Sequence, residues 1–546
     1  MVTPRLVLGP VLRHISHTDA TVWVETNQPC QVEILGFAER TWTVAGHHYA
    51  LITVDGLTAG SAPEYDVRLD GTLVWPADGE QRRPCRIRTL PADGPLRVAF
   101  GSCRYATSAA MADDDHFEPD ALVVLARELA QQDASEWPHA LLMLGDQVYA
   151  DETTPATQRR IAERRDIGVG AKEQVADYEE YTWLYAESWS DPDVRWLMSV
   201  VPTSMIFDDH DVRDDWNTSR SWRTDIQQTD WWAERIIGGL SSYWVYQHLG
   251  NLSPAELAAN DLYQQVRALG SDAEPLLREF AEHADREADG AKGTRWSYRR
   301  DFGPVRLLVI DSRCGRLLDG DRSMISRSEF DWITDQLEGD YDHLLIGTSL
   351  PWLLPRALHD LESWNELLAD GARGARIARW SESLRRAADL EHWAAFGTSF
   401  RALAELIFDI GRGKRGQRPP ATICVLSGDV HHAYAARAFF PEPIATEVYQ
   451  LTCSPLHNYV PTAMKFGFRL SWSRFAERLT RGLLGLVAKV PEIEVSWQRE
   501  AGPYFGNELM TFTAAGRLAT VELSKTRARE QDPALHVVQR IALSSG

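Results

Sequence analysis

The pattern of apolar and polar positions divides the chain into two parts that predict different folds. In residues 20–25 the side chains alternate between apolar and polar, which is typical of a strand with one buried face. Residues 65–75 alternate in the same way on either side of Asp70 and Gly71, a strong turn signal for a hairpin. Short strands at this spacing predict a small β-sandwich, which we place at residues 1–92.

From residue 96 onwards, short and nearly continuous apolar runs are separated by long stretches with a helical pattern. The runs are 96–100, 140–144, 203–207, 305–310, 343–346 and 422–426. Runs of this kind are typical of strands buried on both faces in an α/β fold. We therefore predict one α/β domain over residues 93–546, with helical insertions at about 153–200, 214–294 and 356–418.

Most of the apolar runs end in a group of polar residues. These groups lie at 101–104, 145–149, 208–211, 311–313 and 427–432. In open α/β sheets, ligands bind at the carboxyl ends of the strands. The sequence therefore predicts that five polar groups, far apart along the chain, meet in one site.

Composition limits the classes of function and location. A chain of 546 residues with 44% hydrophobic and 25% charged residues predicts a folded protein of more than one domain. The net charge of −21 argues against binding nucleic acid through its phosphates, although bound metal can reverse the field inside a pocket. The six cysteines are scattered, and neither an export signal nor a membrane-spanning run is visible, so we expect a cytoplasmic protein with reduced thiols.

The polar groups are rich in Asp and His. Asp146 and Asp429 each follow a glycine, and His431 stands two residues after Asp429, within reach of the same centre. Carboxylates that converge on one pocket repel each other unless cations neutralise them, so the pattern favours a metal site. Taken singly, a Gly-Asp pair is also typical of a turn, and Cys103 after a strand is also typical of a buried structural thiol.

Five motifs occur in an order that resembles one known family. They are Phe100-Gly-Ser-Cys103, Leu144-Gly-Asp-Gln-Val-Tyr-Ala-Asp151, Asp208-Asp-His-Asp211, Ile310-Asp-Ser-Arg313 and Leu426-Ser-Gly-Asp-Val-His-His432. In this order they resemble the PhoD-like alkaline phosphatases and phosphodiesterases of the calcineurin-like metallophosphoesterase superfamily. The resemblance covers about residues 96–459. It implies a four-layer αββα sandwich with helical insertions, preceded by a small Ig-like β-sandwich domain.

The resemblance also implies a mixed metal centre. Cys103, Asp146 and Tyr149 would hold Fe³⁺, and Asp146 would bridge to a second metal. That metal would be Ca²⁺, with Mn²⁺, Mg²⁺ and Zn²⁺ as alternatives. The remaining ligands implied are Asp209, Asp429 and His431. Anionic thiolate and phenolate donors suit Fe³⁺, and carboxylates suit a hard ion such as Ca²⁺.

Two further residues are expected to act on the substrate. His210 and Arg313 would stabilise the charge that develops on the phosphate, and His210 would protonate the leaving group. The superfamily has an isolated histidine after its fifth strand, whereas residues 347–349 here read Gly-Thr-Ser.

The predicted activity is hydrolysis of phosphate esters, monoester or diester, by a metal-activated water. The alternatives are a phosphodiesterase specific for lipid or nucleotide diesters and a non-catalytic protein that binds metal or phosphate. The expected partner is a small phosphate ester. Residues 465–489 are basic and amphipathic in an otherwise acidic chain, so packing against the body and weak contact with a membrane surface both stay open.

Overall fold

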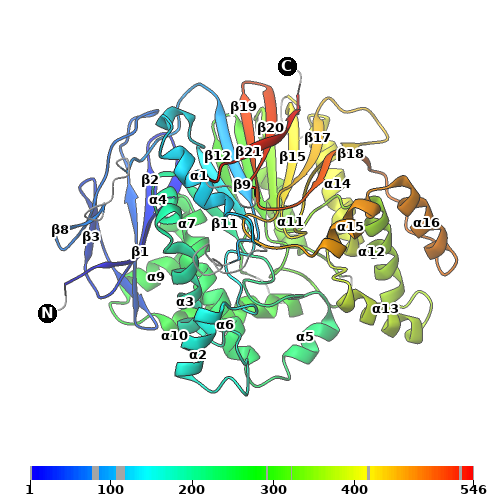
Figure 1. The fold of residues 1–546 in the computed structure, drawn as a ribbon, viewed down its shortest axis with the longest axis horizontal. Helices are drawn as coiled ribbons and strands as arrows, with labels where there is room; N and C mark the ends of the chain where they lie inside the picture. Colours follow the sequence, from blue (N-terminus) through cyan, green and yellow to red (C-terminus); the bar gives the residue numbers. More distant parts are fainter. Residues whose placement is uncertain are drawn as a thin grey trace.

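The structure is a computed structural model that describes residues 3–76, 85–105, 117–290, 293–320, 322–414, 418–527 and 532–544. Its N-terminal part contains two four-stranded sheets, in the orders β1-β2-β6-β5 and β4-β3-β7-β8 (Figure 1). The strands are β1 (Leu6–Ile15), β2 (Ala20–Thr26), β3 (Gln31–Ile34), β4 (Phe37–Arg40), β5 (Trp42–Val44), β6 (His47–Val54), β7 (Val67–Leu69) and β8 (Thr72–Trp75). The likeness of this part to an Ig domain stays a prediction.

Two larger sheets form the rest of the β structure. The six-stranded sheet has the order β11-β10-β9-β19-β20-β21, and the seven-stranded sheet has the order β12-β13-β14-β15-β17-β16-β18. The first consists of β9 (Leu96–Gly101), β10 (Ala140–Leu144), β11 (Thr203–Ile206), β19 (Glu508–Ala515), β20 (Leu518–Lys525) and β21 (His536–Ala542). The second consists of β12 (Tyr298–Phe302), β13 (Val305–Ile310), β14 (His343–Thr348), β15 (Thr422–Ser427), β16 (Ala433–Phe439), β17 (Glu447–Thr452) and β18 (Ser496–Tyr504).

Parallel strands form the part of each sheet that carries the polar groups. β9, β10 and β11 run parallel in one sheet, and β13, β14, β15 and β17 run parallel in the other. All five side chains of β10 and all six of β13 are buried, which explains their continuous apolar sequences. The two sheets stack face to face, since Gly347 of β14 lies against Leu142 and Leu144 of β10.

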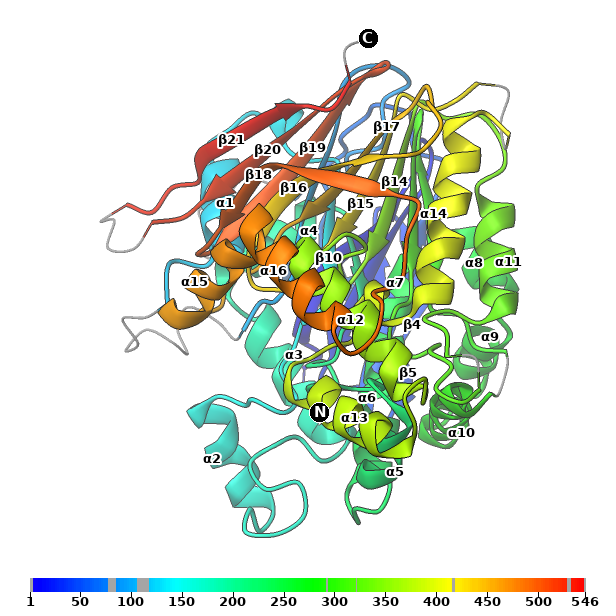
Figure 2. The same cartoon turned by 90° about the vertical axis from the view of Figure 1, so that its right-hand side faces the viewer.

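Helices cover the outer faces of both sheets, so the molecule has the order helix, sheet, sheet, helix (Figures 1 and 2). On the six-stranded sheet lie α1 (Ala121–Leu129) and α4 (Pro192–Val200), and on the seven-stranded sheet lie α11 (Arg327–Gln336) and α14 (Gly397–Gly411). This mixed α/β architecture agrees with the fold class expected from the sequence.

The three predicted insertions contain most of the remaining helices. Residues 153–200 include α2 (Pro155–Arg164) and α3 (Tyr178–Trp189) before α4. Residues 214–294 include α5 (Arg220–Ile226), α6 (Trp232–Tyr243), the π-helix η2 (Trp244–His248), α7 (Leu249–Asn251), α8 (Pro254–Ala259), α9 (Asp261–Ala268), α10 (Glu274–Asp285) and η3 (Arg286–Asp289). Residues 356–418 include α12 (Arg356–Ala369), α13 (Ala375–Ala387) and η4 (Trp393–Ala395) before α14. A short 3₁₀ helix, η1 (Ala134–Glu136), precedes β10.

The N-terminal sheets pack tightly against the second insertion. Arg13 of β1 is buried and donates hydrogen bonds to the carbonyl of Tyr246, at 3.3 Å, and to Asn251 Oδ1, at 3.2 Å. One continuous hydrophobic core therefore runs from the N-terminal strands into the central sheets. The boundary near residue 92 stays a prediction, because no break in the core marks it.

The C-terminal segment adds strands that the sequence analysis did not predict. β19 runs antiparallel beside β9 in the interior of the six-stranded sheet, and β18 forms an edge of the other sheet. Residues 465–489 fall within α15 (Thr462–Ser471), α16 (Arg474–Gly485) and the turn after α16. Among the described residues, no helix is long and apolar enough to cross a membrane, and no disulfide is present.

Candidate metal centre

The five polar groups meet where the carboxyl ends of the parallel strands from both sheets come together. Two overlapping sets of potential ligands lie there. The first set is Cys103, Asp146 and His431, and the second is Asp146, Asp208 and Asp209. Within each set the potential ligand atoms lie within 4.8 Å of one another. Asp146 belongs to both sets, so its carboxylate would face both ions if each set bound one.

The backbone at this site adopts an unusual conformation. Cys103, Asp146, Asp429 and His431 have φ angles of 55°, 54°, 67° and 49°. Residues other than glycine seldom adopt this left-handed region, and such residues cluster at functional sites. Here the conformation turns the chain sharply at the end of β9, β10 and β15.

Two glycines allow the loops to approach one another closely. A Cβ atom at Gly145, whose φ is +110°, would lie 2.6 Å from the Cβ of Asp208. A Cβ atom at Gly428 would lie 1.9 Å from Ser102 Oγ. A Gly-Asp pair is typical of a turn, and the positive φ of Gly145 fits one. Gly428 does not have a positive φ, so there the requirement is for space between β9 and β15.

Cys103 and Tyr149 both face the bridging carboxylate. The Cys103 thiol donates to Asp146 Oδ2 at 3.2 Å, and the Tyr149 hydroxyl donates to the same oxygen at 3.4 Å. Asn458 Nδ2 donates to the Tyr149 oxygen at 2.9 Å. Burial, together with the charge of Asp146, raises the pKa of the Cys103 thiol well above its usual value, and burial likewise raises that of Tyr149. A nearby cation would reverse both shifts.

The residues of this site fit a cationic group. Asp146 Oδ1 and Asp208 Oδ2 are buried and have no hydrogen-bond partner among the described residues. Burial, with the charges of Asp208 and Asp209, raises the pKa of Asp146 well above its usual value. Burial lowers the pKa of His431 to about 4, so its ring is in the neutral form that binds metal. Buried carboxylate oxygens without partners, beside a thiol and a neutral imidazole, are the donors expected around metal ions.

Arg313 lies within the carboxylate cluster. Its side chain is fully buried and contacts Asp209 at 3.2 Å and Asp429 at 3.6 Å. It also pairs with Glu391 at 2.5 Å, and its Nε donates to Asp208. The positive charge of Arg313 therefore offsets part of the negative charge of the surrounding carboxylates.

Two side chains from different parts of the chain, His392 and Arg313, contact the Asp429 carboxylate. Burial alone would raise the pKa of Asp429, but a hydrogen bond from His392 and the charge of Arg313 lower it below its usual value. His392 Nε2 lies 3.1 Å from Asp429 Oδ2, and His392 Nδ1 lies 2.7 Å from Glu362 Oε1. The Asp429 carboxylate is therefore directed at His392 and Arg313, and Asp429 is in neither of the two ligand sets.

His392 and Asp211 are functional-site residues that the sequence analysis missed. His392 stands between α13 and η4 in the third insertion, so a histidine reaches the cluster even though none follows β14. No motif surrounds His392 in the sequence. Asp211 Oδ2 accepts hydrogen bonds from the backbone N–H groups of Asp146 and Asp208, both at 2.9 Å. Asp211 thereby fixes the ends of β10 and β11 against each other.

His210 lies beside the cluster and has a carboxylate partner. Its Nδ1 atom is 2.9 Å from Asp151 Oδ1, and its ring centroid is 4.6 Å from that of Tyr149. Burial opposes the charged ring, but Asp151 outweighs it and raises the pKa of His210 well above its usual value. Asp151 ends the second sequence motif, so its position was visible in the sequence, but its role was not predicted.

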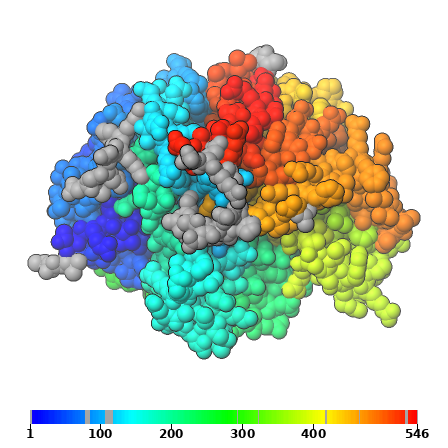
Figure 3. All heavy atoms as spheres, in the orientation of Figure 1, coloured from blue at the N-terminus to red at the C-terminus, as the bar shows by residue number. Residues whose placement is uncertain are grey.

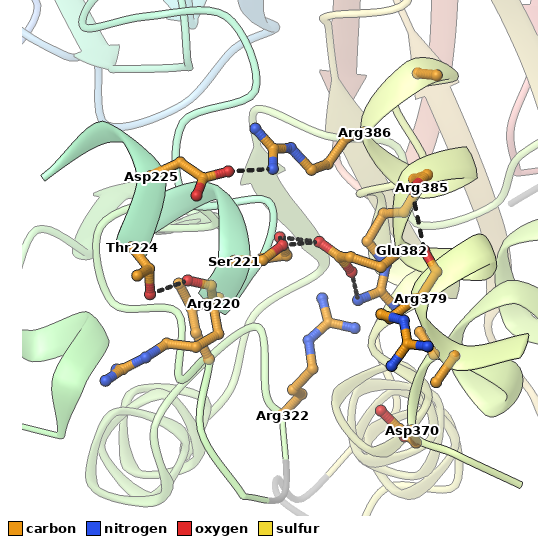
Figure 4. A pocket seen from close by; sticks show the side chains of 16 residues that line it. Arg220, Ser221, Thr224, Asp225, Arg322, Asp370, Arg379, Glu382, Arg385 and Arg386 are labelled. Atoms are coloured by element: carbon orange, nitrogen blue, oxygen red, sulfur yellow. Dashed lines mark hydrogen bonds and ion pairs between the residues drawn. The ribbon is translucent and has the colours of Figure 1, made fainter. Parts of the chain in front are cut away.

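A separate cavity of about 940 Å³ lies between α5 and α13 and contains none of the candidate ligands (Figure 4). Some of its charged groups pair with one another, whereas Arg322 and Arg385 keep buried nitrogens without a partner among the described residues. Arg386 pairs with Asp225 at 2.6 Å, and Glu382 pairs with Arg385 at 3.2 Å and accepts a hydrogen bond from Ser221 at 2.5 Å (Figure 4). The carboxylates, thiol and imidazole that could bind metal lie at the strand ends and not in this cavity, so the strand ends are the better candidate for metal chemistry.

Two stacked sheets with acidic residues and a histidine at the strand ends are the arrangement typical of metallophosphoesterases. Comparison with known proteins identifies the family. Residues 116–465 match the model of the PhoD-like phosphatases, which is more than half of the chain, so this chain belongs to the PhoD-like phosphatase family and is a phosphoesterase hydrolase. Residues 3–87 match a domain of unknown function, DUF7800.

Solved structures show a similar fold at low sequence identity. The structure of PhoD has a TM-score of 0.57 and 12% identity, covering 98% of this chain and 90% of that chain. A purple acid phosphatase, PPD1 from yellow lupin (Lupinus luteus) seeds, has a TM-score of 0.49 and 12% identity, covering 100% of this chain and 74% of that chain, a likeness that supports no further conclusion. No curated protein matches the chain significantly.

Proposed function

We propose that this phosphoesterase is metal-dependent and uses two cations that share Asp146. The supporting observation is that Asp146 belongs to both ligand sets and keeps one buried oxygen without a partner. In this proposal Cys103, Tyr149 and His431 complete the first position, and Asp209 contributes to the second. Asp208 is geometrically close to the second position, but it is also the ion-pair partner of Arg313.

The donor chemistry supports Fe³⁺ at the first position and Ca²⁺ at the second. A thiolate and a phenolate are anionic donors that suit Fe³⁺, whereas the second position offers only carboxylates, which suit a hard divalent cation. Mn²⁺, Mg²⁺ and Zn²⁺ are the alternatives for that position. When bound, such ions neutralise phosphate oxygens and lower the pKa of water enough for hydrolysis near neutral pH.

The residues around the metals orient the substrate and move protons. Arg313 holds Asp208, Asp209 and Glu391 in place and offsets their charge, so an anionic phosphate can enter the pocket. Asp151 keeps His210 protonated and oriented through Nδ1. The opposite nitrogen, Nε2, is then a proton donor for the leaving alkoxide.

The same pocket would accept more than one class of phosphate ester. A pocket that binds one phosphate between two cations accepts a monoester or a diester, and a diesterase specific for lipid or nucleotide esters is the main alternative. Turnover of a chromogenic monoester and of the matching diester, measured on the same preparation, separates these activities.

A chelation experiment tests the metal dependence. Exhaustive treatment with a strong chelator should abolish turnover of both esters, and Ca²⁺ or Mn²⁺ should restore part of it. Treatment with the already metal-loaded chelator is the control and should have no effect. Full turnover by metal-depleted protein would refute the proposal.

A further inference from the structure

An apolar and basic surface covers the helices α15 and α16. Among the described residues, eight of the seventeen large hydrophobic side chains that are exposed lie between residues 464 and 487. The most exposed are Leu486 at 83%, Phe466 at 71% and Phe475 at 69%. Scattered exposed apolar residues are ordinary, but a contiguous group of this kind marks an interaction surface.

Helix α16 has one side that packs on the protein and one that is exposed. Ala476 is buried, and the carbonyl of Leu484 accepts a hydrogen bond from the Trp364 indole of α12, so this side faces the protein. Phe475, Leu479 and Leu483 follow one another at four-residue spacing and point outward, with exposures of 69%, 48% and 56%. These outward residues are not needed for the core, because α16 packs on the protein through other positions, Ala476 and Leu484.

Basic side chains border the outward face. Residues 462–489 contain six Lys or Arg and one Glu, whereas the whole chain has a net charge of −21. Arg481 pairs with Asp360 at 3.1 Å and Lys489 pairs with Glu492 at 2.7 Å. Arg474 and Arg478 have no recorded ion pair in the described part of the chain, and they flank Phe475 and Leu479 along the helix. Figure 3 shows this segment, coloured orange, on the molecular surface.

We propose that the face formed by α15 and α16 docks on a membrane surface that contains anionic lipids. Apolar side chains bordered by Lys and Arg match the acyl boundary and the acidic headgroups of such a surface. The helices have 10 and 12 residues, too short to span a bilayer, so they lie in the interface. A symmetric contact with a second copy would bring the same basic residues against each other, which disfavours that occupant.

The docking face is connected directly to the metal centre. Phe468 of α15 stacks on His432, with ring centroids 4.5 Å apart, and His432 follows the candidate ligand His431. Asn458, which donates to Tyr149, precedes α15 by only a few residues. Docking would therefore bring the site to a membrane, and phosphoesters held in that membrane become the substrate class. This last step rests on the proposed function.

Vesicle sedimentation tests the docking. The full-length protein should sediment with vesicles of phosphatidylcholine and phosphatidylglycerol at low salt, and much less with phosphatidylcholine alone. The double variant Arg474→Glu, Arg478→Glu should bind the anionic vesicles at least about thirtyfold more weakly. Arg327→Glu, which reverses an Arg side chain that is 90% exposed on α11, is the matched control and should bind like the unchanged protein.

Each other outcome contradicts the docking. Equal sedimentation with both vesicle types, or none with anionic vesicles, would overturn it. A change in oligomeric state caused by Arg474→Glu, Arg478→Glu without vesicles would overturn it in favour of a second copy.

Turnover separates the docking from the proposed function. The double variant should hydrolyse a soluble chromogenic ester at the normal rate, yet release phosphate from vesicle-borne phosphatidic acid about tenfold more slowly. Vesicle binding without turnover of any ester would refute the proposed function and leave the docking intact. Equal loss on both substrates would contradict the link between docking and substrate.

Discussion

The metal centre and the contact between the N-terminal sheets and the second insertion are both buried and both contain charged groups, but their carboxylates differ. Glu25 of β2 has both oxygens occupied, because His47 Nδ1 lies 3.0 Å from Oε1 and the Tyr246 hydroxyl donates to Oε2 at 3.0 Å. Asp146 has one oxygen in contact with Cys103 and Tyr149 and the other without a partner.

This difference is the one expected between a structural carboxylate and a metal ligand. A buried acid that the protein itself satisfies stabilises the fold, since desolvation is repaid by hydrogen bonds. A buried acid left incomplete costs stability and persists where an additional group completes it. Four non-glycine residues with a positive φ, Cys103, Asp146, Asp429 and His431, lie at the metal centre, but the N-terminal sheets contain such residues too, at Leu35 and Ala45, so the backbone alone does not separate the two regions.

The largest predicted effect is that of Asp146→Asn. Loss of the shared charge should remove metal from both positions and reduce turnover by about a thousandfold or more. The free energy of unfolding of the metal-free protein should stay the same or rise, since repulsion with Asp208 and Asp209 is relieved. Metal content, turnover and urea denaturation measure the three quantities. If the Asp146→Asn protein bound metal and stayed active, Asp146 would be a structural carboxylate like Glu25.

Tyr149→Phe should have the next largest effect, lowering turnover by about ten- to a hundredfold. If Tyr149 binds Fe³⁺, the protein is coloured by charge transfer from the ring, and this substitution should bleach or shift the visible band. The packing volume is kept, so stability should change little. Cys103→Ser is the companion variant and should lower iron content, because a neutral hydroxyl replaces a thiolate. An unchanged spectrum and rate for Tyr149→Phe would make Tyr149 a packing residue.

Glu25→Gln should lower stability and leave metal content and turnover unchanged, the reverse of what Asp146→Asn does. It disrupts the contacts with His47 and Tyr246, so we expect a loss of about 2 kcal/mol in the free energy of unfolding. Metal content and turnover per folded molecule should be unchanged, because Glu25 belongs to the other region. Loss of metal without loss of stability would show that the two regions are not independent.

The smallest predicted effect is a pH dependence of stability at His47. Burial opposes its charged form, but Glu179 and Glu25 outweigh burial and raise the pKa of His47 to about 9. Because the folded-state pKa lies above the unfolded value near 6.5, this stabilisation is complete below about pH 6.5 and is lost as the pH rises through about 9. We expect a decrease of about 1 kcal/mol over that range, given the partial exposure of His47.

Denaturation of metal-free protein at several pH values measures this decrease. His47→Gln should flatten the pH dependence while leaving the metal centre unchanged. His48 is a titratable neighbour of His47, and the Tyr178 ring packs against the His47 ring. The comparison with His47→Gln therefore isolates the contribution of His47. The same pH dependence in both proteins would assign the effect to another group.

The parts of the fold that could be predicted from the sequence are those in which the local pattern of apolar residues reflects their burial. The runs 140–144 and 305–310 are strands because both of their faces are buried, and their polar ends converge because parallel strands end on the same edge. β19 was not predicted: on one side it forms a hairpin with β20, and on the other it pairs with β9, about 400 residues earlier in the chain. Pairing over such a separation leaves no local pattern.

The candidate site shows the same limit. Cys103, Asp146, Tyr149, Asp209, His210 and Arg313 stand in motifs at strand ends, and the structure brings them together. His392 could not be found, because it enters from a helical insertion and its neighbours in the sequence carry no motif. Asp211 lies within a motif, but its role depends on hydrogen bonds to Asp146 and Asp208, which only the three-dimensional arrangement reveals.

Elemental analysis of protein purified without added chelator tests the central claim most directly. The account predicts about two metal ions per chain, iron among them, with both lost in Asp146→Asn and both retained in Glu25→Gln. Fully active protein that contains no stoichiometric metal would contradict it.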